Sequence, residues 1–180
     1  MIKFKFENKS VVAPNCWEEV TVGHFINPYF LSGDSVSLLS SLSGIERNKL
    51  LNTVEDIEGP LNRMVKFIQE DPEGFKGEFT NEFEFRGKKL KVPLNIEVER
   101  MGQKIMLQDA MVKHQSSIYE AIPDAVAIYL QPEINDGVFD DSQLEGMKEE
   151  ILELKIADVF PIASFFLTKF NTIAKSGLPS

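Results

Sequence analysis

The chain has 180 residues, and 43% of them are apolar, which is enough for one sizeable hydrophobic core and argues against disorder. Its 28 acidic and 19 basic residues give a formal net charge of -9, so its field repels phosphate backbones and anionic lipid. Nucleic acid and membrane surfaces are therefore not expected as partners. No apolar run approaches the roughly 20 residues that span a bilayer. Cys16 is the single cysteine, which excludes an internal disulfide and agrees with a reducing compartment.

Residues 1–12 predict a β-hairpin. Ile2, Phe4 and Phe6 alternate with lysines, which is the period of a half-buried strand. The stretch 7–10, Glu-Asn-Lys-Ser, then supplies turn chemistry before a second apolar pair. The chain is therefore expected to open with two antiparallel strands.

Residues 21–70 change to a helical period in short pieces, which predicts three or four short helices. Leu38, Leu39 and Leu42 share one face of one of these helices. Gly44 follows at the position where a left-handed residue commonly ends a helix.

Residues 79–99 predict an antiparallel strand pair. Apolar residues occupy one parity in each arm, namely Phe79, Phe83 and Phe85 in the first arm and Leu90, Val92, Leu94, Ile96 and Val98 in the second. With Arg86-Gly87 as a two-residue turn, Phe83 faces Leu90 on the buried side. Glutamates of the first arm then face lysines of the second on the solvent side, so one register satisfies both faces.

Residues 103–177 return to the helical period. Ser142 and Glu145 have the spacing of a capping box at the start of one of these helices. The same kind of helix start is indicated earlier in the chain by the spacing of Thr53 and Asp56. A last helix is expected to start near Asp158 and to stop by Gly177, with Pro161 in its first turn.

These patterns predict an α+β fold that is mostly helical. It comprises an N-terminal hairpin (1–12), short helices (21–70), a central antiparallel strand pair (79–99) and further helices (103–177). The sequence has no internal repeat and no evident linker, so a single domain over residues 1–180 is expected.

Catalytic and metal motifs are missing from the sequence. His24 and His114 have no second ligand at a spacing typical of a metal site. Cys16 and His24 could in principle form a nucleophile and its base, but a half-buried thiol beside Trp17 is the ordinary interpretation. The run Ser41-Leu42-Ser43-Gly44 does not form a serine-nucleophile turn, because the glycine two residues before the candidate nucleophile is absent. The chain is therefore expected not to be an enzyme and to use no cofactor and no metal.

Acidic residues gather in the second half of the chain. The loop containing Glu133, Asp136, Asp140 and Asp141 fails the spacing of an EF-hand, so a solvated acidic turn is the simpler interpretation. An enzyme or small-ligand site remains open if acids meet only in the folded chain. The candidates for such a site are Glu120, Asp124, Asp136 and Asp140.

Aromatic residues supply the candidate partner-binding surface. These residues are Phe160, Phe165, Phe166 and Phe170 on the last helix, together with Trp17. Phe165 lies about 100° around the helix from Phe166, so the apolar face is wider than one contact requires. The face either completes the core or docks a helix of a partner.

The order of several segments resembles tail-assembly-chaperone-type proteins of tailed bacteriophages. The similar segments are W-E-E-V-T-V at 17–22, L-L-S-S-L-S-G-I at 38–45, Gly102-Gln103, A-I-Y-L-Q-P at 127–132 and F-F-L at 165–167. The resemblance covers most of the chain and rests on short motifs. It brings no catalytic residues, because that family acts by binding.

The resemblance implies a non-enzymatic phage assembly or virion protein that binds other phage structural proteins, such as the tape-measure protein or tail components. It would act in the cytoplasm of the infected bacterium or as part of the virion, and it could form a homo-oligomer. An alternative is an acidic inhibitor or immunity-type protein that covers a basic active site. Salt-sensitive binding to a basic toxin would favour that alternative.

Overall fold

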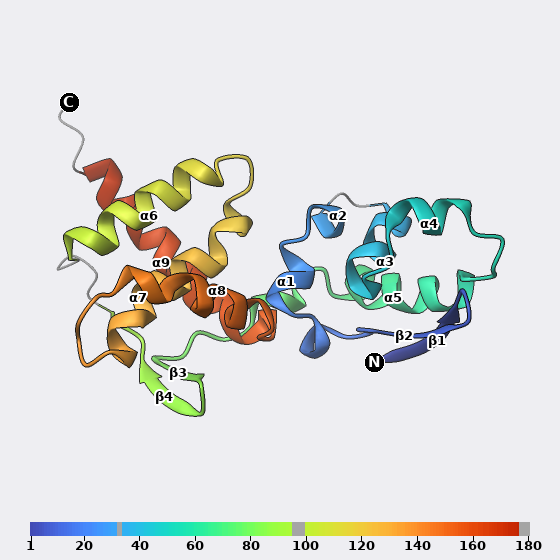
Figure 1. Ribbon diagram of the computed structural model, residues 1–180, viewed down its shortest axis with the longest axis horizontal. Helices are drawn as coiled ribbons and strands as arrows, with labels where there is room; N and C mark the ends of the chain where they lie inside the picture. The colour runs from blue at the N-terminus through green and yellow to red at the C-terminus, as the bar shows by residue number, and fades with distance from the viewer. Residues whose placement is uncertain (32–33, 95–99, 177–180) are drawn as a thin grey trace. The chain divides into compact units, whose positions relative to one another are not determined.

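The computed structural model describes residues 1–31, 34–94 and 100–176 (Figure 1). Helices dominate, and the strands form two separate antiparallel pairs, so the predicted α+β class is confirmed. The chain divides into two compact units. Unit 1 contains Met1–Lys76 and Lys155–Ala157, and unit 2 contains Gly77–Leu154 and Asp158–Ser180. The expected single domain over residues 1–180 stays a prediction.

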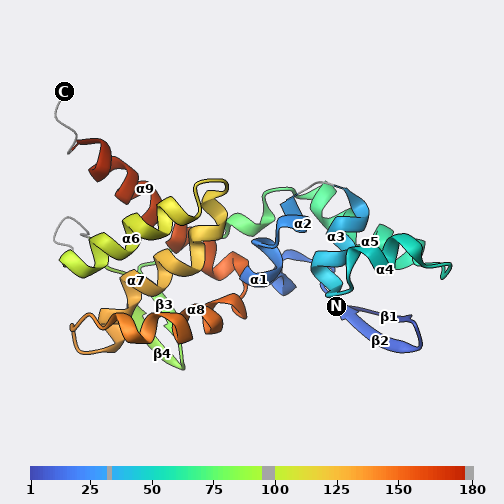
Figure 2. The same ribbon diagram turned by 45° about the horizontal axis from the view of Figure 1, so that its top comes forward.

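Unit 1 begins with the predicted hairpin. Strands β1 (Ile2–Phe6) and β2 (Lys9–Ala13) pair so that Ile2 lies opposite Ala13. Glu7 and Asn8 form the turn with φ of 47° and 63°, because a two-residue turn of this kind matches the twist of the strands. Figures 1 and 2 both show the two strands side by side.

Short helices follow in unit 1, and within the described residues there are five α-helices instead of the three or four expected. The elements are η1 (Trp17–Glu19), α1 (Val22–Phe25), α2 (Pro28–Leu31), α3 (Ser35–Ser43), α4 (Arg47–Asn52), α5 (Glu58–Glu70) and η2 (Gly74–Lys76). Gly44 ends α3 with φ of 69°, as predicted. The helix start predicted from Thr53 and Asp56 is wrong, since α5 has Ile57 as its N-cap and no side chain caps it.

An aromatic cluster around Trp17 forms part of the interior of unit 1, beside buried aliphatic residues such as Leu39 and Leu42. The indole ring packs against Phe30, Phe67 and Phe75 with centroid distances of 6.0, 5.3 and 5.3 Å. Its Nε1 donates to the backbone oxygen of Asp71 at 2.6 Å. A Cβ atom on Gly74 would lie 2.1 Å from the ring, so the close approach of this backbone requires glycine.

Residues 155–157 complete unit 1. Lys155 forms an antiparallel bridge with Thr21, and the backbone NH of Ile156 donates to the oxygen of Val20 at 2.9 Å. Ile156 is fully buried. Unit 1 therefore depends on a segment that is far from its other residues in the sequence.

The strand pair of unit 2 has the predicted register. In strands β3 (Glu82–Phe85) and β4 (Lys88–Lys91), Phe83 lies opposite Leu90, and both are buried. Arg86 and Gly87 form the turn with φ of 52° and 69°. The strands are shorter than the predicted range.

Two residues of the predicted buried parity are exposed, because they lie beyond the strand ends. Phe79 is 44% exposed and Leu94 is 54% exposed. The predicted positions of Ile96 and Val98 lie outside the described residues.

The helices of unit 2 are α6 (Met101–Lys113), η3 (Ile118–Ala121), α7 (Ile122–Ile134), η4 (Asp141–Gln143), α8 (Leu144–Leu152) and α9 (Ile156–Ser176), the last of which begins in unit 1. The predicted capping box of Ser142 and Glu145 is wrong. Asp140 instead caps the 3-10 turn η4, with its carboxylate accepting from the NH of Ser142, and α8 has Gln143 as its N-cap without a side-chain cap. The last helix starts two residues before the predicted Asp158, so Pro161 lies inside it.

Helix α7 forms the centre of unit 2. Its residues from Ile122 to Pro132 are all buried, including Asp124 and Gln131. The Tyr129 ring stacks on Phe166 of α9 with 4.3 Å between centroids. Gln103 of α6 donates to the backbone oxygen of Ile128 at 3.0 Å. The interior of unit 2 therefore combines apolar packing with buried polar side chains.

Candidate functional site

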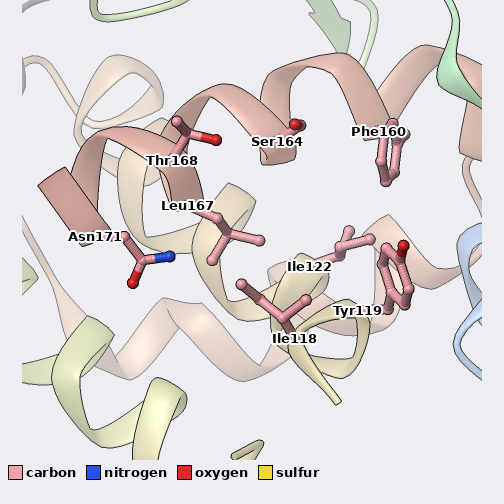
Figure 3. Close-up of a pocket in the computed structure, with 8 residues that line it drawn as sticks. All are labelled: Ile118, Tyr119, Ile122, Phe160, Ser164, Leu167, Thr168 and Asn171. Atoms are coloured by element: carbon pink, nitrogen blue, oxygen red, sulfur yellow. The ribbon is translucent and has the colours of Figure 1, made fainter.

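A pocket opens on unit 2 between η3, the start of α7 and α9 (Figure 3). It encloses about 110 Å³ and is lined by Ile118, Tyr119, Ile122, Phe160, Ser164, Leu167, Thr168 and Asn171. We call it the η3–α9 pocket. None of these side chains is charged, although the whole chain carries a net charge of -9.

Helix periodicity places the α9 residues of the pocket. Positions 160, 164, 167 and 171 follow one another at intervals of four, three and four, and position 168 follows 164 by four, so they share one face of α9. Figure 3 shows Leu167 pointing toward Ile118 and Ile122, while Ser164, Thr168 and Asn171 present hydroxyl and amide groups along α9. The pocket is thus an apolar depression with an uncharged polar edge.

The predicted phenylalanines of α9 divide between two environments. Phe166 is fully buried and Phe170 is 8% exposed, so both belong to the core. Phe160 is half-buried and lines the pocket. Phe165 is also half-buried, and its ring lies 5.1 Å from that of Phe79 and 5.9 Å from the Lys169 ammonium.

Trp17 belongs to the aromatic cluster of unit 1, where it is 6% exposed. Of the five residues predicted to bind a partner, Phe160 alone lines the pocket. No sequence pattern indicated Ile118 and Tyr119, because they lie in a 3-10 turn without a helical period. Leu167 could have been found, since it follows Phe160 by seven residues on the same helix.

A charged cluster joins four elements of unit 2, and some of its residues are close in sequence to residues that line the pocket. We call it the His114 cluster, and it consists of His114, Glu120, Asp124, Glu145 and Lys148. The imidazole Nε2 lies 3.1 Å from Asp124 Oδ2, and Nδ1 lies 3.4 Å from Glu120 Oε2. Lys148 Nζ lies 2.7 Å from Asp124 Oδ1 and 3.1 Å from Glu145 Oε2.

Electrostatics stabilise the Lys148 ammonium in this cluster. Burial by itself lowers the pKa of Lys148, but the hydrogen bond and the charge of Asp124, with help from Glu145, outweigh burial and raise it above its ordinary value. The Asp124 carboxylate is buried and is shared by His114 and Lys148. Such a network fixes α6, η3, α7 and α8 relative to one another.

The four acids considered for a site formed only in the fold separate into two groups. Glu120 and Asp124 meet at His114, as described above. Asp140 instead accepts from Ser142 and Gln143, which lowers the pKa of Asp140, and Asp136 lies in the turn after α7 with φ of 48°. The four carboxylates therefore do not line one pocket.

The cysteine and the other histidine have structural roles. His24 Nδ1 accepts from the backbone NH of Thr21 at 3.2 Å and completes a capping box of α1. Burial raises the pKa of the Cys16 thiol, and the neighbouring carboxylates of Glu18 and Glu19 raise it further, which disfavours the nucleophilic thiolate. The absence of catalysis remains a prediction.

The described residues contain neither a metal-binding cluster nor a membrane-spanning helix. Within residues 1–31, 34–94 and 100–176, no three His, Cys, Asp or Glu side chains are grouped so that they could hold a metal ion. In that part of the chain, no helix combines the length and the apolar character needed to cross a bilayer. No family model, curated protein or solved structure matches the chain.

Proposed function

We propose that this chain is a non-enzymatic assembly protein that binds an apolar segment of another protein, with the η3–α9 pocket as the anchor point. The observation that carries the proposal is the pocket itself, an open depression of about 110 Å³ lined by eight uncharged residues. Its volume suits one large aliphatic or aromatic side chain. Interfaces commonly depend on a few such anchors in well-packed pockets.

The partner segment is proposed to be an amphipathic helix with basic residues beside its anchor. Unit 2 carries most of the acidic excess of the chain, so basic flanks would be attracted while the anchor enters the uncharged pocket. The resemblance to tail-assembly-chaperone-type proteins suggests that the partner is a phage structural protein, such as the tape-measure protein or a tail component. An acidic surface also favours solubility and disfavours contact with DNA.

Co-expression with phage tail proteins tests the proposal. We expect one of them to co-purify with the wild-type chain. Ile118→Glu places a charge at the pocket, where Ile118 is 41% exposed, and should reduce the recovered partner at least tenfold. The matched control is Val138→Glu, because Val138 is 61% exposed in a loop of the same unit and does not line the pocket.

Two results would contradict the proposal. One is that no tail protein associates with the wild-type chain. The other is that Ile118→Glu and Val138→Glu leave association equally unchanged, because the partner would then bind elsewhere. Circular dichroism of each variant checks that the fold is kept.

A further inference from the structure

Helix α6 has apolar residues on two opposite sides. One side is buried in unit 2 through the apolar residues Leu107 and Ala110, beside the buried amide of Gln103. The other side carries a row of four residues that we call the α6 stripe. The α6 stripe consists of Met101, Ile105, Gln108 and Val112, and its three apolar members are 72%, 47% and 70% exposed.

Such a second apolar face is unusual for a helix at a protein surface. A helix that covers a core normally has one apolar face and a polar face opposite to it. Contiguous exposed apolar residues mark surfaces that contact another molecule. We therefore expect the α6 stripe to contact another molecule.

The spacing of the α6 stripe is that of a coiled-coil seam. Its members follow at intervals of four, three and four residues, which are the intervals of alternating d and a positions in a heptad. Ile105 and Val112 then occupy a positions, and Met101 and Gln108 occupy d positions. β-branched residues at a favour a two-stranded parallel pair.

Charges beside the stripe identify a second copy of the chain as the occupant. Lys104 occupies the g position and Asp109 the e position of the same heptad frame, five residues apart. In a parallel pair, g of one helix faces the following e of the other, so Lys104 of each copy meets Asp109 of its partner. Both side chains are exposed, and neither forms an ion pair among the described residues of a single chain.

We infer that two copies of this chain associate through their α6 stripes as a short parallel helix pair. Ile105 and Val112 pack on their symmetry mates, and the two Gln108 amides meet and can hydrogen-bond across the axis. An antiparallel pair places e beside e and g beside g, so it does not join Lys104 to Asp109. The charge pattern therefore selects the parallel orientation.

The dimer is expected to be weak. A seam of four residues per helix buries less than the roughly 1,200 Å² of a stable complex. Association should therefore depend on concentration. This inference stands on α6 alone and does not require the proposed partner or the η3–α9 pocket.

Sedimentation velocity over a concentration series tests for the dimer. We expect the wild-type chain to shift from monomer to dimer as its concentration rises toward the millimolar range. Ile105→Lys should remain monomeric at every concentration, because it places a charge in the seam. Val138→Lys, at an exposed apolar residue outside the stripe, should behave as wild type.

Exchanging the charges of Lys104 and Asp109 distinguishes this interface from any other. Lys104→Asp and Asp109→Lys each replace two attractive pairs by two repulsive ones, so each should raise the dimer Kd by on the order of tenfold or more. The double variant, Lys104→Asp with Asp109→Lys, restores opposite charges and should recover a Kd near the wild-type value. Lys113→Asp, the same charge change outside the g and e positions of α6, is the control.

Cysteine crosslinking tests the orientation. In a Cys16→Ser background, Gln108→Cys should form a disulfide-linked dimer under mild oxidation, because d faces d in a parallel pair. A mixture of Ile105→Cys and Gln108→Cys chains should give little mixed dimer. A monomer at all concentrations, a Kd indifferent to the charge exchange, or preferential mixed crosslinking would each overturn the inference.

Discussion

The interiors of the two units differ in chemistry. Unit 1 contains a cluster of Trp17 and neighbouring phenylalanine rings, in which the indole NH donates to one backbone oxygen. Unit 2 contains the stacked rings of Phe166 and Tyr129 but also the buried carboxylate of Asp124 with His114 and Lys148. Unit 1 therefore holds an aromatic cluster within a largely aliphatic interior, whereas the elements of unit 2 are also joined by ion pairs.

The largest expected effect comes from the apolar part of unit 2. Phe166→Ala removes a fully buried ring and should lower the free energy of unfolding by about 3 to 5 kcal/mol. Phe160→Ala is the matched control, because Phe160 is half-buried at the η3–α9 pocket and its loss should cost clearly less. Urea unfolding followed by far-ultraviolet circular dichroism measures both, and equal losses would contradict the two environments assigned to these rings.

The charged part of unit 2 should give the next largest effect. Lys148→Met leaves the buried Asp124 carboxylate with His114 as its remaining partner in the cluster, and should cost about 2 to 3 kcal/mol. Adding Asp124→Asn should recover part of this loss, because the uncompensated buried charge is then removed. A double-mutant cycle in urea measures the coupling, and additive losses would argue against it.

The pKa of Lys148 gives this prediction a pH dependence. An ammonium group whose pKa is raised on folding stabilises the folded state when the pH is below the ordinary lysine pKa of about 10.4. The contribution is lost as pH rises through the folded-state pKa. The difference in stability between wild type and Lys148→Met should therefore be constant near neutrality and shrink in strongly alkaline solution.

In unit 1 the sharpest test is the contact between a glycine and the indole ring. Gly74→Ala would place a Cβ atom 2.1 Å from the Trp17 ring and should cost about 1 to 3 kcal/mol. Gly59→Ala in α5 is the control, because that Cβ meets nothing within 4 Å and alanine favours a helix by up to about 1 kcal/mol. Trp17 is the single tryptophan of the chain, so its fluorescence during unfolding reports on this unit.

The smallest expected effect concerns a surface ion pair of unit 2. Arg86 donates to Glu150 at 2.6 and 2.9 Å, which lowers the pKa of Glu150. Because both side chains are largely exposed, Glu150→Gln should cost at most about 1 kcal/mol at neutral pH. A carboxylate whose pKa is lowered on folding stabilises the folded state when the pH is above the ordinary glutamate pKa. This stabilisation is lost as the pH falls through the folded-state pKa. Glu149→Gln on the same helix should change little at any pH.

Sequence patterns were most informative where partners are close in the chain. The register of Phe83 with Leu90 could be predicted because a two-residue turn, a period of two and opposite charges all agree. The helix stop at Gly44 could be predicted because only a local backbone conformation decides it.

Longer-range features of the site could not be predicted in this way. The meeting of Glu120 and Asp124 at His114 depends on how α6 and α7 pack, and no spacing encodes that packing. The phenylalanines of α9 showed an apolar face, but the sequence did not say that Phe166 is covered while Phe160 borders a pocket. The capping box of Ser142 and Glu145 did not form, because residues 141–143 make a 3-10 turn that Asp140 caps, and α8 begins only after it.

The segment 155–157 has a consequence for the time course of folding. Hairpins closed by two-residue turns form in roughly 1 to 10 μs, so β1 and β2 can pair soon after they leave the ribosome. The bridge between Thr21 and Lys155 and the burial of Ile156 must wait until a segment 134 residues beyond Thr21 has been made. Folding of unit 1 can thus begin before that of unit 2, but it cannot be completed before α8 has been synthesised.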